Sequence, residues 1–218
     1  MALKIDTEKA FDSIEWSFLL NALRLHGFNS TWINWVSQCI SSPSFSFLIN
    51  GSPFGNFKSS RGLRQGDPLS PFLYIIGADV LSRLLQRAET FNSLKGTKIS
   101  PGCPQISHLQ FADDLLIFSK ANHTSSATIL DCLATYQSWS AQKINYSKSG
   151  VIFSKNTNGQ TTANLSHLLN LKKVSPTTKH LGLPLELNRA KSSSFQGLIE
   201  KIQNHVCYPN INLRGGVI

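Results

Sequence analysis

Two adjacent aspartates, Asp113 and Asp114, lie between two short apolar segments, and this arrangement constrains the fold more than any other feature of the chain. The flanking residues, 109–111 and 115–118, have the composition of β-strands, so we expect the pair at a tight turn between two strands. Neighbouring carboxylates repel each other unless a positive charge lies beside them. The segment therefore indicates a site for a divalent cation, although Asp-Asp also occurs in ordinary solvated hairpins.

A third aspartate, Asp6, ends a short apolar segment near the start of the chain. Mg²⁺ prefers octahedral oxygen coordination, usually by one or two protein carboxylates together with water and substrate phosphates. If Asp6 and Asp113 end neighbouring strands, they can supply the two carboxylates that two-metal phosphoryl transfer uses. The alternative interpretation of Asp6 is a cap of the helix that follows it.

The segment between these aspartates, residues 60–71, contains two glycines and ends in a predicted helix start at Pro68. Gly62 and Gly66 allow a close approach of the backbone to a ligand, and arginines between and before them favour phosphate. A helix N-terminus adds its own attraction for anions. The alternative is a surface turn that precedes a core helix.

Three phrases in this order, KIDTEKAFDSIEW, RGLRQGDPLSPFLY and HLQFADDLLIF, resemble motifs A, B and C of the reverse transcriptase palm. The closest similarity is to plant-type non-LTR (LINE-type) retrotransposons. INYSKSG resembles motif D, and HLGLPL resembles the segment that leads towards the primer grip. The resemblance covers nearly the whole chain and implies an α+β fold, the polymerase palm, with an antiparallel sheet and helices packed on one face.

The resemblance implies a role for each matching residue. Three aspartates would bind metal and form the catalytic centre: Asp6, Asp113 and Asp114. Gln65 and Gly66 would line the incoming nucleotide and the template base, and Arg64, together with Arg61, would help to bind phosphates there, or else these are ordinary surface arginines. Phe11 would exclude a ribonucleotide 2′-OH, or else it is a core aromatic. Lys148 would protonate or neutralise the pyrophosphate leaving group, or else it is an exposed lysine without a role.

The implied activity is RNA-directed DNA synthesis, in which two Mg²⁺ ions, with Mn²⁺ as an alternative, join a primer 3′-OH to a dNTP. The implied partners are an RNA template, a DNA primer and dNTPs. Two other interpretations stay open: a catalytically inactive palm remnant that at most binds nucleic acid, and another Mg²⁺-dependent enzyme such as a phosphohydrolase. Because the sequence opens almost directly on motif A, we expect a palm at residues 1–155 and a truncated post-palm segment at 156–218.

Composition agrees with a nucleic-acid partner. The formal charge of +9 and the pI near 9.6 suit a polyanion. The four cysteines have no metal-ligand spacing and indicate reduced thiols, as in a nuclear or cytoplasmic protein, and the resemblance implies the nucleus. No apolar run is long enough to span a bilayer, so no membrane partner is expected.

Hydrophobic periodicity and turn residues predict the coarse order of the elements. The predicted helices are 15–27, 30–41, 69–90 and 124–141. The predicted strands are 2–6, 45–49, 54–58 and 151–153, together with a hairpin over 107–119. Asn50-Gly51 predicts a hairpin turn, and 154–162 predicts a polar loop. Asp12 is expected to cap a helix, and Asp67 to organise the turn before Pro68.

Overall fold

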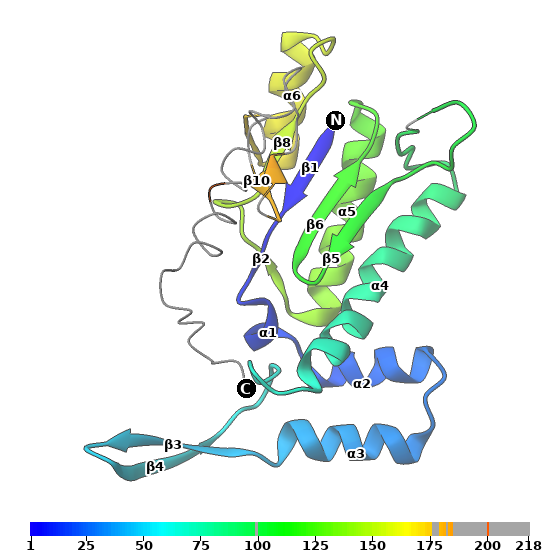
Figure 1. Ribbon diagram of the computed structural model, residues 1–218. Helices are drawn as coiled ribbons and strands as arrows, with labels where there is room; N and C mark the ends of the chain where they lie inside the picture. The colour runs from blue at the N-terminus through cyan, green and yellow to red at the C-terminus, as the bar shows by residue number, and fades with distance from the viewer. Residues whose placement is uncertain (99, 176–178, 182, 185–199, 201–218) are drawn as a thin grey trace, which may run out of the picture. The chain divides into compact units, whose positions relative to one another are not determined.

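The computed structural model (Figure 1) describes residues 1–98, 100–175, 179–181, 183–184 and 200. The chain divides into two compact units, Met1–Lys173 and Val174–Ile218. The elements of the first unit are β1 (Ala2–Ile5), β2 (Thr7–Glu8), α1 (Ala10–Ser13), α2 (Trp16–Leu25), α3 (Ser30–Ser41), β3 (Ser44–Ile49), β4 (Ser52–Lys58), α4 (Ser70–Thr90), β5 (His108–Phe111), β6 (Asp114–Phe118), α5 (His123–Ser140), β7 (Lys143–Ile144), β8 (Gly150–Ile152), α6 (Gly159–Leu169) and β9 (Lys172–Lys173).

In the second unit, the described residues include β10 (Lys179–His180) and β11 (Leu183–Pro184), which pair antiparallel. The HLGLPL segment overlaps this pair, whereas most of the predicted post-palm segment lies outside the described residues. The predicted boundary near residue 155 between a palm and a post-palm segment stays a prediction. The compact first unit itself continues to Lys173 because α6 and β9 pack onto it.

The main sheet has five strands in the order β5-β6-β1-β8-β9, so the first strand of the chain lies at its centre. Leu3 pairs with Ile117 of β6 on one side and with Val151 of β8 on the other, both antiparallel. Strand β9 runs parallel to β8 because α6 supplies the crossover connection that a parallel pair needs. The α+β palm fold is confirmed, with one parallel strand at the edge of an otherwise antiparallel sheet.

One face of this sheet carries the core. Burial alternates along β1, where Leu3 and Ile5 are buried and their neighbours are only half-buried. The buried side chains join one apolar cluster with α4 and α5; in Figure 1, α5 lies behind β1 and β6, and α4 passes beside β5. Burial of this apolar area stabilises the unit by about 25 cal/mol for each Å² removed from water. Helices therefore cover one face of the sheet, as predicted.

Several turns and caps follow directly from local sequence. The side chain of Asn29 accepts a hydrogen bond from the backbone N–H of Trp32 (2.8 Å), so α3 begins where it was predicted. Asn50 and Gly51 both have positive φ, at 50° and 81°, and join β3 to β4. The aromatic side chains of this hairpin are exposed, including Phe47 at 65% and Phe54 at 70%, and the hairpin projects beyond α3 in Figure 1.

The prediction of a polar loop over residues 154–162 was wrong in its second half, because α6 begins at Gly159. The Asn158 side chain accepts a hydrogen bond from the backbone N–H of Gln160 (2.9 Å) and caps the helix. Leu165 and Leu169 are the buried residues of this helix, too few to produce a clear helical period in the sequence. No helix in the described ranges is long and apolar enough to cross a membrane.

A fully buried amide, Gln142, lies between three helices. Its Nε2 donates to the carbonyl oxygen of Ala10 in α1 (2.8 Å), and its Oε1 accepts from the Tyr136 hydroxyl of α5 (2.7 Å). The Tyr74 side chain of α4 also lies close to it, near enough for the amide to lower the pKa of Tyr74. Because only 2% of Gln142 is exposed, these partners replace water almost completely.

A charged contact fastens the end of α2 to α4. Asp79 accepts from His26 Nε2 (2.9 Å) and from Arg83 Nε (2.6 Å), and His26 Nδ1 lies 2.8 Å from the carbonyl oxygen of Ala22. Burial alone would raise the pKa of Asp79, but the hydrogen bonds from Arg83 and His26 outweigh it and hold the pKa below its usual value.

We expect Gln142→Leu to lower the free energy of unfolding by about 3 kcal/mol, because it leaves the Ala10 carbonyl and the Tyr136 hydroxyl buried and unpaired. Tyr136→Phe removes only one hydroxyl and should cost about 1 kcal/mol. Urea denaturation followed by circular dichroism measures both. Equal midpoints for Gln142→Leu and the wild type would show that the amide is not needed for stability.

We expect Asp79→Asn to cost about 0.5–1 kcal/mol at neutral pH, a modest value because Asp79 is partly exposed. The pKa of Asp79 is depressed in the folded state, so its contribution is present above the unfolded pKa of about 3.9 and is lost as pH falls through the folded pKa. The difference between the wild type and Asp79→Asn should therefore shrink below about pH 3.9. Urea midpoints over a pH series measure it, with Asp131→Asn, an exposed aspartate, as control; a constant difference would contradict the prediction.

Candidate active site

The three predicted aspartates lie at one end of the sheet. The last pair between β1 and β6 is Ile5 with Leu115, so Asp6 and Asp114 lie next to this pair at the same end. Ala112 and Asp113 form the two-residue turn between β5 and β6, and Ala112 has a φ of 52°. Strand pairing thus brings together segments that are about a hundred residues apart in the sequence.

The exposure of these carboxylates suits a site that faces solvent. Asp113 is exposed, and Asp6 and Asp114 are half-buried. Carboxylate oxygens are the ligands that Mg²⁺ prefers. In the described part of the chain, however, no group of three or more His, Cys, Asp or Glu side chains is arranged to hold a metal ion.

The turn that carries Lys148 is hydrogen bonded to the main chain of Asp6. The N–H of Asn145 donates to the carbonyl oxygen of Asp6 (2.8 Å), and the N–H of Asp6 donates to Ser149 Oγ (3.0 Å). The N–H of Lys148 donates to the carbonyl oxygen of Asn145 (3.2 Å) and closes the turn, and its side chain is exposed. The structure therefore places Lys148 beside the strand end that carries Asp6.

Phe11 lies in α1, directly after this strand end, and stacks on Tyr74 of α4. The ring centroids are 4.6 Å apart and the rings are inclined by 17°. Burial raises the pKa of Tyr74 to about 12; the nearby Asp113 charge adds to the increase, and the amide of Gln142 opposes it. Tyr74 is therefore a neutral support for Phe11, and it lines the same small cavity as Asp113.

The predicted glycine loop packs onto the segment that contains Phe11. The N–H of Leu63 donates to the carbonyl oxygen of Phe11 (2.6 Å), and Trp16 Nε1 donates to the carbonyl oxygen of Gly62 (2.6 Å). A Cβ atom at Gly62 would lie 2.6 Å from the carbonyl oxygen of Asp12, so only glycine allows this approach. Gly66 has open space around it, but its φ of 85° is a backbone conformation that favours glycine.

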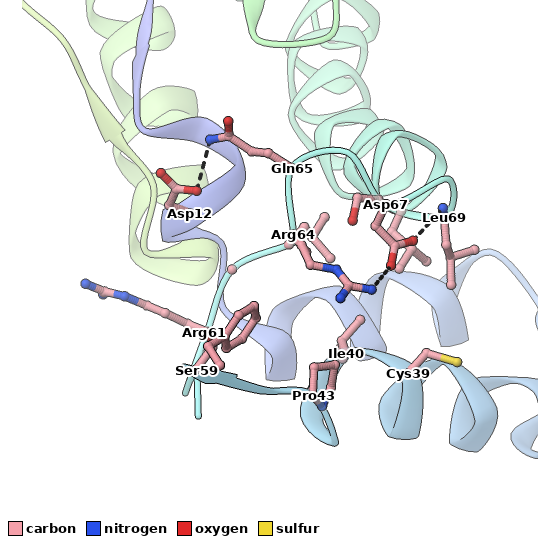
Figure 2. A pocket seen from close by; sticks show the side chains of 15 residues that line it. Asp12, Cys39, Ile40, Pro43, Ser59, Arg61, Arg64, Gln65, Asp67 and Leu69 are labelled. Atoms are coloured by element: carbon pink, nitrogen blue, oxygen red, sulfur yellow. Dashed lines mark hydrogen bonds and ion pairs between the residues drawn. The ribbon is translucent and has the colours of Figure 1, made fainter. Parts of the chain in front are cut away.

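The side chains of this loop surround a cavity of about 330 Å³ that also borders the end of α3 (Figure 2). Arg64 donates to Asp67 Oδ2 (2.8 Å), and the backbone N–H of Leu69 donates to Asp67 Oδ1 (2.8 Å). The bond from Arg64 is the main reason why the pKa of Asp67 is lowered. Asp67 thus organises the turn before the helix, as predicted. Figure 2 shows Arg61 extending away from Arg64.

Gln65 reaches across to the segment after β1 and donates through Nε2 to Asp12 Oδ1 (3.2 Å). The prediction that Asp12 caps a helix was wrong. Asp12 lies within α1, and the next helix has Glu15 at its N-cap without a side-chain cap bond. The Asp12 carboxylate instead accepts from an amide that lies 53 residues further along the chain.

Two residues that support this site were not identified from the sequence. Tyr74 carries Phe11, and Gln142 lies beside Tyr74 and joins α1 to α5. Gln142 follows the end of α5 in a polar stretch, and nothing in its local pattern indicates burial. Tyr74 lies within the predicted helix 69–90, where an aromatic residue is expected to belong to the hydrophobic core and gives no sign of a role at the site.

Comparison with known proteins agrees with the motifs. A family model described as "Reverse transcriptase (RNA-dependent DNA polymerase)" matches residues 1–196. An uncharacterized mitochondrial protein of Arabidopsis thaliana is 54% identical over 68 residues, which are 31% of this chain and 56% of that protein. A Pol polyprotein of the type-1 retrotransposable element R2 from Popillia japonica is 31% identical over 53% of this chain and 18% of its own length.

A Pol polyprotein of the type-2 element R2DM from Drosophila melanogaster is 30% identical over 66% of this chain, but only 13% of that protein is covered. The matched part of this chain therefore spans between about an eighth and just over half of these relatives. These relatives confirm the resemblance to non-LTR retrotransposons.

Among solved structures, telomerase from Candida tropicalis in complex with a fragment of telomeric RNA has a similar fold, with a TM-score of 0.61 at 13% identity. The match covers 94% of this chain and 33% of that one, and it supports the palm fold alone. The family model, by contrast, covers most of the 218 residues. The chain belongs to the reverse transcriptase (RNA-dependent DNA polymerase) family.

Proposed function

We propose that this palm catalyses RNA-directed DNA synthesis, in which a primer 3′-OH attacks the α-phosphate of a dNTP and pyrophosphate leaves. The observation that carries the proposal is the common sheet end at which Asp6, Asp113 and Asp114 lie, beside Phe11 and the glycine loop. The proposed partners are an RNA template, a DNA primer and dNTPs. Residence in the nucleus is part of the proposal and follows from the family alone.

The donor set fits Mg²⁺, with Mn²⁺ as an alternative ion, because all three side chains offer carboxylate oxygens. Two ions bound there would activate the attacking oxygen and stabilise the charge on the transferred phosphate. One or two protein carboxylates suffice for such ions, since water and substrate phosphates supply the other ligands. Asp6 and Asp113 are the proposed main ligands, with Asp114 as the third acidic member, and mutual repulsion favours separation of the carboxylates when no cation is bound.

The remaining residues of the site have proposed roles in binding. The ring of Phe11, held by Tyr74, would occupy the space that a 2′-OH needs and so favour deoxynucleotides. Gln65 and Gly66 would contact the nucleotide and the template base, with Arg64 released from Asp67 to meet a phosphate. Lys148, beside Asp6, would neutralise or protonate the leaving pyrophosphate.

We expect Asp113→Asn to reduce Mg²⁺-dependent primer extension on poly(rA)/oligo(dT) by at least about a hundredfold, because it removes one charge from the proposed metal site. Asp131→Asn is the matched control, because it makes the same change at an exposed aspartate of α5. Circular dichroism verifies that both variants fold. Equal extension by the two variants would remove Asp113 from the mechanism. No extension by a folded wild-type chain would favour a palm that binds nucleic acid without catalysis.

We expect Phe11→Val to raise ribonucleotide incorporation relative to deoxynucleotides by on the order of tenfold or more, because the smaller side chain leaves room for the 2′-OH. Phe28→Val is the control, since Phe28 also stacks on a neighbouring aromatic ring, that of Trp32 (4.5 Å), at the α2–α3 connection. The ratio of dNTP to rNTP incorporation is the measurement. An unchanged ratio in an active Phe11→Val variant would assign Phe11 to the core alone.

A further inference from the structure

A second concave surface, which we call the α6 groove, lies between the turn after β7, the end of α6 and β9. It has a volume of about 580 Å³, and its lining includes Tyr146, Ser147, Ser166, His167, Asn170 and Lys172. Nearly all of these side chains are polar, and none is acidic. The groove shares no lining residue with the cavity beside the glycine loop.

Strand register places the α6 groove at the catalytic end of the sheet. Lys172 of β9 pairs with Gly150 of β8, and Gly150 pairs with Lys4 of β1. Asp6 follows two residues after Lys4, at the end of β1. The groove and the candidate aspartates therefore open at the same end of the sheet, with the Lys148 turn between them.

The charged side chains nearest the groove are lysines: Lys172 in its lining, Lys173 next to it in β9, and Lys148 in the turn that carries Tyr146. All three are exposed, and the ion pairs of the described residues include none of them. These lysines favour an anionic partner such as a polyanion.

The polar groups of the groove suit a sugar–phosphate backbone. Ser147 of the groove lining is exposed and offers a hydroxyl group. Asn170 has a φ of 51° at the C-cap of α6, and its side chain is exposed beside Lys172. Tyr146 is 41% exposed and can stack on a base. Hydroxyl, amide and ammonium groups are the side chains that contact phosphate and sugar oxygens in nucleic-acid complexes.

We infer that the α6 groove binds the sugar–phosphate backbone of a single nucleic-acid strand that passes the candidate active site. The inference rests on the nucleic-acid partner of the proposed function, but not on catalysis. Free pyrophosphate has the same phosphate chemistry, but it would use only the charged groups and leave Tyr146 without a base to stack on.

Fluorescence anisotropy of a labelled oligo(rU) strand, in EDTA and over a salt series, tests the inference without any turnover. Lys172→Glu removes a positive charge from the groove, and Asn170→Asp adds a negative one with little change of shape. Each has a matched control: Lys120→Glu, an exposed lysine just beyond β6 at the opposite end of the sheet, and Asn164→Asp, an exposed residue of α6 outside the groove lining. Thermal melts verify that all four variants fold.

We expect both groove variants to weaken binding by on the order of fivefold, and Lys172→Glu to lower the slope of log affinity against log salt by about 1. The two controls should bind like the wild type. Tyr146→Leu should weaken strand binding but not pyrophosphate binding, because only a strand offers a base to stack on.

Groove variants that bind like their controls, or a wild-type chain that binds no strand, would overturn the inference. Equal loss of strand and pyrophosphate binding in Tyr146→Leu would also overturn it, in favour of a free-phosphate site. Absence of primer extension by the wild-type chain, with strand binding intact, concerns catalysis alone. The two proposals can therefore fail separately.

Discussion

The side-chain amide of Gln142 is the contact on which the geometry of the candidate site depends. It is hydrogen bonded to Ala10 of α1 and to Tyr136 of α5 and lies beside Tyr74 of α4, and a buried amide of this kind is stable only when its hydrogen-bond partners are in place. Phe11 follows Ala10 directly and stacks on Tyr74, so the amide determines both the backbone and the ring support of Phe11. A residue 132 positions from Ala10 thus sets where the ring of Phe11 lies.

The segment after β1 has a similar role for the main chain. The carbonyl oxygen of Asp6 accepts from the turn of Lys148, and the carbonyl oxygen of Phe11 accepts from the glycine loop. Main-chain bonds of this kind hardly depend on side-chain identity. The backbone of Asp6 and Phe11 therefore holds three distant segments together independently of the contacts that the two side chains make.

Much of this arrangement could be predicted because local patterns determine it. The Asp113-Asp114 hairpin, the start of α3 at Asn29 and the Asn50-Gly51 turn all follow from neighbouring residues. Contacts between distant residues could not be predicted in the same way. The partner of Asp12 is Gln65, 53 residues away, and the hydrogen-bond partners of Gln142 come from two helices. Helix α6 was not predicted because only two of its residues, Leu165 and Leu169, are buried. Its N-cap, Asn158, is also a residue type that is common in loops.

The central position of β1 has a consequence for how the protein folds during its synthesis on the ribosome. Leu3 cannot complete its pairing until Ile117 and Val151 have been synthesised, so β1 is enclosed only after these later strands have been made. Pairings over such sequence distances are slow to form, because the intervening chain must be ordered before the contact is gained. During that interval an apolar strand and the aspartate that follows it stay exposed and can bind other chains or chaperones. The formation of β1, which Asp6 follows, therefore depends on two strands that are made well after it.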